Sequence, residues 1–192
     1  MTAEKKGYDG QRTVRCFLGV PVSDELAEPL MASVETSLDD LPPLRMTSRE
    51  NLHLTLVFVG SIAEQVLHNE LIPQITERLR EAKPGRIYFR QVTGFPSAEV
   101  PEHLVLEGHG SPSAESLRES LNQGLAELKP TPAEEDRAWR PHITLGRFRE
   151  RQARAVQPTP WQTDLPVGSV VLYESETTLY GPVYRMRHQW PL

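Results

Sequence analysis

The chain has 192 residues and a mass of 21.7 kDa, which suits one large domain and is too short for two ordinary independent ones. Hydrophobic residues make up 38% and charged residues 24%, a composition that excludes collagen-like, coiled-coil and wholly disordered chains. The formal net charge of −5 means that the molecule as a whole does not attract nucleic acid by its charge.

The sequence shows no sign of a membrane or secreted protein. No apolar run approaches the roughly 18 residues that span a bilayer, and the polar start MTAEKKGYDGQRT contains no apolar stretch like that of a secretory signal. The single cysteine, Cys16, excludes an internal disulfide, and because it lies in an apolar run we read it as a core residue. We expect a cytoplasmic protein with a flexible tail at 1–12 and a single domain at 13–192.

Charge is unevenly distributed along the chain. Six acidic residues and no basic one lie from Asp24 to Asp40, whereas six arginines and one acidic residue lie from Arg137 to Arg154. The arginine-rich segment offers a local attraction for a phosphate. The alternative is a solvated strand and loop that happen to be rich in arginine.

Apolar periodicity predicts an alternation of short strands and helices. In chain order we expect a strand at 14–20, a helix starting at Ser23, a loop at 39–50, a strand at 52–59, a helix at about 63–82, strands at 86–92 and 103–106, a helix from Ser113, and strands at about 141–148, 169–174 and 183–189, with a proline-containing loop at 157–168. Pro29 should kink the first helix or mark its real beginning, and Pro73 should disturb the second. The later strands follow one another through short turns, which indicates a largely antiparallel α+β fold.

One tetrapeptide occurs twice. His53-Leu54-Thr55-Leu56 returns 89 residues later as His142-Ile143-Thr144-Leu145. Side chains alternate between the two faces of a strand, so in each copy histidine and threonine share one face and the apolar residues the other. A single copy is typical of a half-buried strand with a hydrogen-bonded histidine. Two copies facing each other instead favour a site with two imidazoles and two hydroxyls.

This set of side chains suits displacement at phosphorus. Such a reaction needs a base for the attacking oxygen and an acid for the leaving oxygen, and histidine serves as either near neutral pH. Threonine hydroxyls and a guanidinium, for which Arg147 is the candidate, stabilise the phosphate oxygens. A cyclic phosphodiester is strained, so the site can work without a metal. His103 and His109 have no zinc-site spacing, and we expect neither metal nor cofactor.

The two motifs resemble the signature of the two-histidine (2H) phosphoesterases. The surrounding sequence resembles in particular the RNA 2′,3′-cyclic phosphodiesterase family, historically called 2′-5′ RNA ligases. This resemblance covers about residues 13–190, and the segments that carry it are RCFLGV (15–20), NLHLTLVFVG (51–60), GFP (94–96), WRPHITLGR (139–147), LYES (172–175) and GPVY (181–184).

The resemblance implies a bilobed α+β fold, in which two pseudo-symmetric antiparallel β-sheets face each other across a central cleft with helices on the outer sides. It implies hydrolysis of a terminal 2′,3′-cyclic phosphate to a 2′-phosphate without metal, on RNA ends or nucleotides, with ATP or GTP as further ligands of the cleft. We expect a monomer. Two alternatives stay open, namely 2′-5′ ligation of RNA ends in the same site and a nucleotide- or RNA-binding regulator with little catalysis.

Carried across by motif, the resemblance also implies roles for single residues. The catalytic residues are His53 and His142, the phosphate ligands are Thr55, Thr144 and Arg147, and Phe58 is the position of an aromatic that stacks on a base. As a hypothesis, His142 activates water and His53 protonates the leaving O3′.

Two of these positions conflict with simple alternation. Phe58 and Arg147 each lie five residues after a histidine, so a regular strand places them on the wrong face. Each strand must therefore twist or bulge near its end, where Gly60 and Gly146 make this easy. The alternative for Phe58 is a core aromatic.

Overall fold

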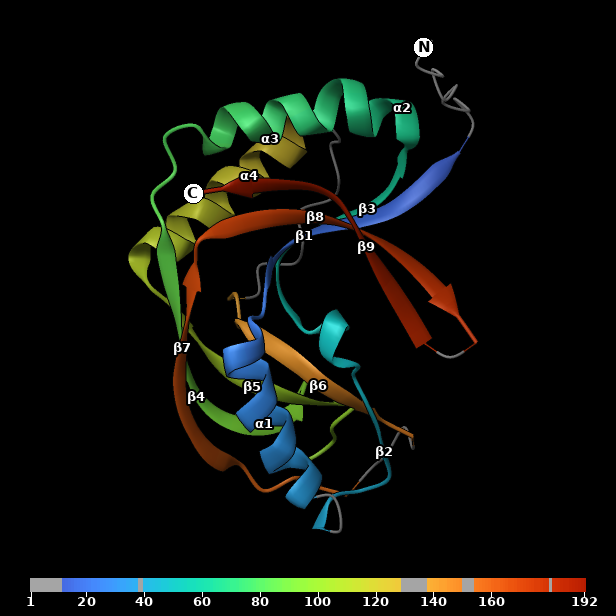
Figure 1. Ribbon diagram of the computed structural model, residues 1–192, viewed down its shortest axis with the longest axis vertical. Helices are drawn as coiled ribbons and strands as arrows, with labels where there is room; N and C mark the ends of the chain where they lie inside the picture. The colour runs from blue at the N-terminus through green and yellow to red at the C-terminus, as the bar shows by residue number, and fades with distance from the viewer. Residues whose placement is uncertain (1–11, 38–39, 129–137, 150–153, 180) are drawn as a thin grey trace, which may run out of the picture.

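The computed structural model describes residues 12–37, 40–128, 138–149, 154–179 and 181–192. The tail expected at 1–12 lies outside these residues except for Arg12, and the single domain at 13–192 stays a prediction. The elements are β1 (Thr13–Pro21), α1 (Asp24–Thr36), β2 (Leu44–Met46), the 3₁₀ turn η2 (Arg49–Asn51), β3 (His53–Ala63), α2 (Glu64–Val66), the π-helical turn η3 (Leu67–Leu71), α3 (Ile72–Leu79), β4 (Gly85–Phe95), β5 (His103–Gly110), α4 (Pro112–Leu128), β6 (His142–Phe148), β7 (Thr159–Val167), β8 (Ser169–Thr178) and β9 (Gly181–Pro191) (Figure 1).

The described strands form one antiparallel sheet of two halves. Its order is β7-β4-β5-β6-β3-β1-β8-β9, and β2 pairs with β6 beside this path. We call β3, β1, β8 and β9 the first half and β6, β5, β4 and β7 the second half. At the boundary, β3 and β6 share a single aligned residue pair, Leu54 with Ile143. The expected bilobed α+β fold is confirmed, with its two sheets joined at this pair.

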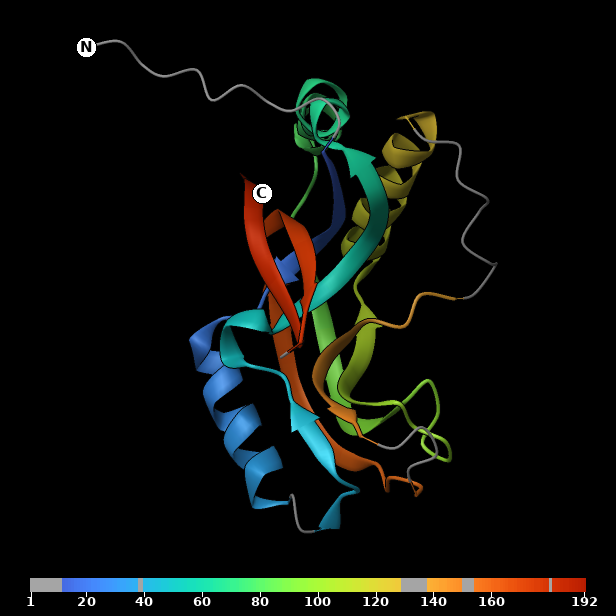
Figure 2. The ribbon, with the colours of Figure 1, turned by 90° about the vertical axis from the view of Figure 1, so that its right-hand side faces the viewer.

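Helices pack against both halves. In Figure 1, α2 and α3 lie beside the first half and α1 lies over strands of the second, and Figure 2 shows α1 and α4 on opposite sides of the molecule. The helix α4 contacts β3 of the first half and β4 and β5 of the second. In α4, Leu117, Leu121 and Leu125 recur every four residues and are buried, so one apolar stripe faces the core. None of the described helices is long and apolar enough to cross a membrane.

The two faces of the sheet differ in chemistry around the repeated motifs. The apolar residues of both copies are fully or almost fully buried in one core that both halves share: Leu54, Leu56, Ile143 and Leu145. The histidines and threonines lie on the other face and are half-buried. We call this second face the histidine face and the first the core face.

Several expected boundaries are wrong. The loop expected at 157–168 contains β7, which among the described strands pairs with β4 alone, and an edge strand tolerates Pro160 and Pro166 because one of its sides needs no ladder bonds. The loop expected at 39–50 contains β2 and η2. The strand expected to end at Gly60 continues to Ala63, with Gly60 in the left-handed region at φ 75°.

The prolines act differently from one helix to the other. Pro29 lies inside α1, which runs unbroken from Asp24, so it is not the start of the helix. The helical segment expected at about 63–82 is divided by the π-helical turn before Pro73, which occupies the first turn of α3. The first turn tolerates proline because its N–H needs no helical partner there.

Candidate active site

Each histidine of the repeat is oriented by the backbone just before it. The Nδ1 atom of His53 lies 2.7 Å from the carbonyl oxygen of Asn51, and that of His142 lies 2.8 Å from the carbonyl oxygen of Arg140. A carbonyl oxygen only accepts, so in both rings Nδ1 donates the proton of this hydrogen bond. In both rings Nε2 is then the nitrogen that exchanges a proton with a ligand.

The pairing of β3 with β6 brings the four motif side chains together, and we call this group of His53, Thr55, His142 and Thr144 the block. Leu54 faces Ile143 in the aligned pair, and in each strand the histidine directly precedes this residue and the threonine directly follows it, so the four side chains flank the pair. In a regular antiparallel pair with this alignment, the two histidines would occupy diagonal positions about 7–8 Å apart. His142 also lies close enough to act electrostatically on the pKa of His53.

A phenylalanine from another strand supports each imidazole. The ring centroids of Phe17 and His53 lie 4.6 Å apart, and those of Phe95 and His142 lie 4.5 Å apart with 23° between the planes. Sequence reasoning missed both phenylalanines as site residues. They come from β1 and β4, and nothing in one sequence gives the pairing of strands so distant along the chain.

Bulges resolve the conflict over Phe58 and Arg147. In β3, Leu56 has no partner in the register with β1, and in β6, Leu145 has none in the register with β5. One extra residue returns the following side chains to the histidine face. The bulge that we expected is therefore confirmed in both strands: Leu145 lies next to Gly146, and β3 has a second unpaired residue, Val59, next to Gly60.

The two returned side chains are placed differently. Phe58 is 59% exposed, so the alternative of a core aromatic is wrong, and its ring lies 6.4 Å from that of Phe17. Arg147 is exposed and lies opposite His103 of β5. Burial is the main cause that lowers the pKa of His103, and the positive charge of Arg147 lowers it further.

Burial lowers the pKa of both motif histidines. For His53 the carbonyl of Asn51 opposes this effect and the charge of His142 adds to it. For His142 the carbonyl and the charge of Arg140 act in opposite directions, and the Glu107 carboxylate raises the pKa. The neutral imidazole is favoured in both, so each Nε2 can accept a proton near neutral pH.

Arg140 is a third residue whose place at the site the sequence did not reveal. Its guanidinium lies 2.6 Å from Oε1 of Glu107, donates to the carbonyl oxygen of Pro96 at 2.7 Å and lies 4.8 Å from the ring centroid of Phe95. Arg140 thus holds the phenylalanine that supports His142 and, through its own carbonyl, the imidazole itself.

The remaining candidates lie away from this block. Within the described part of the chain, no three His, Cys, Asp or Glu side chains are grouped as a metal ion would need. Cys16 is 1% exposed on the core face, as expected for a core residue. Burial, aided by the charge of Glu174, raises the pKa of its thiol to about 12.

A sheet of two halves that each bring a His-x-Thr strand to one block defines the class of two-histidine phosphoesterases. The family model of the 2′-5′ RNA ligase superfamily matches residues 21–177. The chain belongs to this family.

Relatives and solved structures cover nearly the whole chain. It is 27% identical over 179 residues to the RNA 2′,3′-cyclic phosphodiesterase of Archaeoglobus fulgidus, covering 90% of this chain and 97% of that protein. It is 28% identical over 183 residues to the protein of the same name from Thermus thermophilus, covering 93% and 90%. A solved structure from Thermus thermophilus matches with a TM-score of 0.80 at 25% identity over 93% of this chain and 97% of its own. The fold is also that of Escherichia coli LigT complexed with NADP+, with a TM-score of 0.72 at 22% identity over 94% and 99%.

Proposed function

We propose that this protein is an RNA 2′,3′-cyclic phosphodiesterase, which hydrolyses a terminal 2′,3′-cyclic phosphate to a 2′-phosphate. One observation carries the proposal: two histidines, one from each half, are oriented by the same backbone hydrogen bond and flank, with two threonines, the residue pair at which the halves meet. The names of the relatives, all RNA 2′,3′-cyclic phosphodiesterases, support it.

The phosphate binds between the two strands that meet at Leu54 and Ile143. Thr55 and Thr144 donate hydrogen bonds to its non-bridging oxygens, and the Arg147 guanidinium adds the charge that stabilises them. Negative charge on these oxygens grows as the bond to water forms, so the same contacts strengthen in the transition state.

The two histidines supply acid and base on opposite sides of phosphorus. Nε2 of His142 removes a proton from water, the water oxygen bonds to phosphorus, and the bond from phosphorus to O3′ breaks. Nε2 of His53, in its protonated form, gives its proton to O3′. The 2′-phosphate leaves, and transfer of a proton from His142 to His53 through solvent restores the starting state.

The rest of the nucleotide extends over the first half. The exposed Phe58 ring stacks on the terminal base, next to Phe17. Escherichia coli LigT has been solved with 3′-AMP, with ATP and with phosphate, which supports nucleotides such as ATP or GTP as further ligands of this site. We place the protein in the cytoplasm as a monomer that acts on RNA ends.

A short RNA with a 2′,3′-cyclic phosphate separates this function from its rivals. Incubated with the protein in EDTA, it should yield a 2′-phosphate end, and adding a 5′-hydroxyl partner should leave hydrolysis dominant because water is in large excess. A product joined by a 2′-5′ bond as the main outcome indicates a ligase. Tight binding with no product indicates a regulator, and activity that requires an added metal ion contradicts the two-histidine mechanism.

A further inference from the structure

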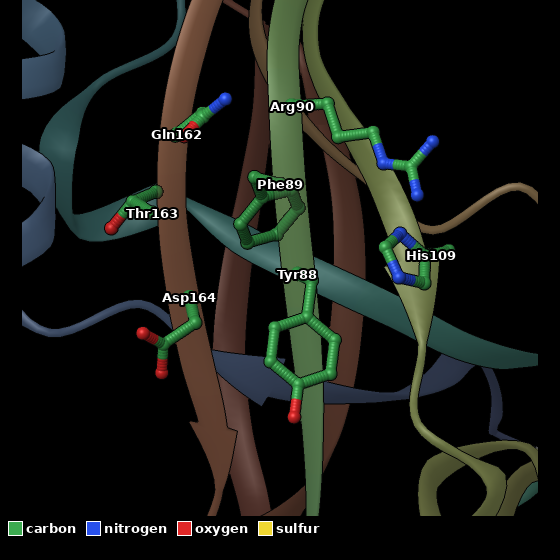
Figure 3. A pocket seen from close by; sticks show the side chains of 7 residues that line it. All are labelled: Tyr88, Phe89, Arg90, His109, Gln162, Thr163 and Asp164. Carbon is green, nitrogen blue, oxygen red and sulfur yellow. The ribbon is translucent and has the colours of Figure 1, made fainter.

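A pocket lies on the second half of the sheet, outside the block of motif residues. Its volume is about 670 Å³, and its lining comes from β4, β5 and β7: Tyr88, Phe89, Arg90, His109, Gln162, Thr163 and Asp164 (Figure 3). This volume falls in the range of about 300–1,000 Å³ typical of small-molecule sites. Nothing in the proposed reaction uses these residues.

The pocket shares the histidine face with the block. Glu107 lies opposite His142, and His109 follows Glu107 by two residues in a regular part of β5, so all three side chains are on one face. Tyr88 lies opposite His109, and their ring centroids are 5.4 Å apart. The neighbours of Tyr88 in β4, Ile87 and Phe89, are buried in the core, which confirms this assignment of faces.

The distance between the block and the pocket matches the distance between successive phosphates of an RNA strand. Two residues along β5 separate the row of His142 and Glu107 from the row of Tyr88 and His109, a distance of about 7 Å. Successive phosphates of an extended single strand are separated by a comparable distance. A strand whose terminal phosphate lies at His142 therefore reaches the pocket with its next nucleotide.

Arg90 lies between these two rows. It is the unpaired extra residue of a bulge in β4, between Phe89 and Gln91, and Gln91 lies opposite Glu107. Arg90 is exposed, and no described carboxylate pairs with it, whereas the neighbouring acid of the pocket, Asp164, is held by Arg86. In Figure 3 its side chain extends toward β5, the strand of His109. A cation at this position meets the phosphate that links two nucleotides.

We propose that this pocket binds the nucleotide that precedes the terminal one in the RNA substrate. Its base stacks on the rings of Tyr88 and His109, and the linking phosphate binds Arg90. The proposal rests on the proposed function for the terminal cyclic phosphate. Tyr88 is 41% exposed and His109 is exposed, so an open two-ring surface accepts any base by its π-face. The protein then prefers an RNA end to a free cyclic nucleotide.

The test compares two substrates with 5′-hydroxyl ends, a nucleoside 2′,3′-cyclic phosphate and a dinucleotide ending in the same group. The wild type should hydrolyse the dinucleotide with a kcat/KM about tenfold higher, the usual size of one stacked base. Tyr88→Ala and Arg90→Gln should each remove most of this preference and leave kcat/KM for the single nucleotide unchanged. Tyr88→Phe, which keeps the ring, should keep the preference.

Matched controls come from the opposite face of the first half. His188, whose ring lies 4.5 Å from that of Trp190, faces Leu172, and Arg185 faces Glu174, so both point away from the histidines. His188→Ala and Arg185→Gln should keep the wild-type preference. An equal kcat/KM for the two substrates in the wild type, or an unchanged preference in Tyr88→Ala, overturns the proposal.

A binding measurement separates this proposal from the proposed function. Titration calorimetry with the dinucleotide ending in a 2′-phosphate needs no catalysis, and Tyr88→Ala should weaken its binding about tenfold while leaving that of the nucleoside 2′-phosphate unchanged. If the wild type hydrolyses neither substrate, the proposed function fails, and this difference in binding still decides for or against the pocket.

Discussion

The two halves of the sheet present the same His-x-Thr pair and differ in what surrounds it. In each half a strand begins with His-x-Thr, bulges at the next leucine and brings the fifth residue after the histidine back to the same face. In the first half that residue is Phe58, and in the second it is Arg147. Displacement at phosphorus needs two such histidines, one as the acid and one as the base.

The difference between the aromatic Phe58 and the charged Arg147 extends to the residues opposite them on neighbouring strands. Phe58, Phe17 and Tyr173 form an aromatic row in the first half, with the rings of Phe17 and Tyr173 stacked at 5.0 Å. The corresponding row of the second half consists of Arg147, His103 and Phe95. One half therefore offers ring surfaces to a base, and the other offers positive charge and an imidazole to a phosphate.

A symmetric site would bind a nucleotide equally well in either direction. The two unequal rows remove this ambiguity, because only one orientation places the base on rings and the phosphate beside a guanidinium. The orientation in turn decides which histidine faces the leaving oxygen. Under the proposed function, catalysis therefore depends on what the two halves share, and the orientation of the substrate depends on what they do not share.

Removing either shared histidine should have the largest effect. We expect His53→Ala and His142→Ala each to lower hydrolysis of the cyclic phosphate at least about a hundredfold, the usual contribution of a general acid or base. Steady-state kinetics measures the loss, and circular dichroism checks that each variant is folded. A folded variant with near-normal turnover would show that its half contributes no catalytic group.

A change of leaving group should separate the roles of the two histidines. A p-nitrophenolate leaves without a proton, so replacing the acid should cost far less with a p-nitrophenyl phosphodiester than with the cyclic phosphate, while replacing the base should cost the same with both. With His53 as the acid, His53→Ala is the variant that the activated diester rescues. Selective rescue of His142→Ala would exchange the two roles.

Arg147 should matter more than its counterpart Phe58. Arg147→Ala removes the charge beside the phosphate, and we expect a loss of about a hundredfold in kcat/KM, as when one transition-state donor is removed. Arg147→Lys keeps the charge without the planar fork and should lie between this variant and the wild type. Wild-type kinetics in Arg147→Ala would exclude the residue from the site.

Phe58 should contribute to binding alone. Phe58→Ala should raise KM about tenfold with kcat nearly unchanged, because a stacked base is held equally in the ground state and the transition state. Phe58→Trp, which keeps an aromatic surface, is the matched variant and should retain a low KM. An equal fall in kcat for the alanine variant would place Phe58 in the chemical step instead.

The smallest expected effect is on the pH profile. Burial lowers the pKa of both His53 and His142, so the bell-shaped profile of kcat/KM should centre below pH 6.5. The negative charge of Glu107 raises the pKa of His142, so Glu107→Gln should lower that pKa further. Only the limb that belongs to His142 then moves to lower pH, and it is the acid-side limb if His142 is the base. Movement of both limbs would contradict this assignment.

The sequence was sufficient for the features that repeat or alternate. The two His-x-Thr motifs, their core leucines and the need for a bulge before Phe58 and Arg147 all follow from counting residues along a strand. The adjacent apolar residues Leu56 and Val57 already mark where alternation fails. Boundaries were less predictable where proline or glycine lies inside a strand, as in β7 and at Gly60, because edge position and a left-handed φ depend on neighbouring strands.

The surroundings of the site were beyond the reach of the sequence. Phe17, Phe95 and Arg140 come together with the histidines only through the register of five different strands. The spacing of residues within one strand carries no information on that register. For the same reason the sequence contained no sign that Tyr88 and His109 line one pocket, even though they are only 21 residues apart.

The buried thiol of Cys16 provides a built-in probe of local opening of the sheet. Alkylating reagents react with the thiolate, which is nearly absent below the pKa of about 12, so intact protein should resist iodoacetamide. Cys16 precedes Phe17, the ring beneath His53, and β1 lies between β3 and β8. Modification then requires β1 to separate locally from its neighbours. The alkylation rate, read by mass spectrometry, therefore measures how often the strand that supports the His53 imidazole opens.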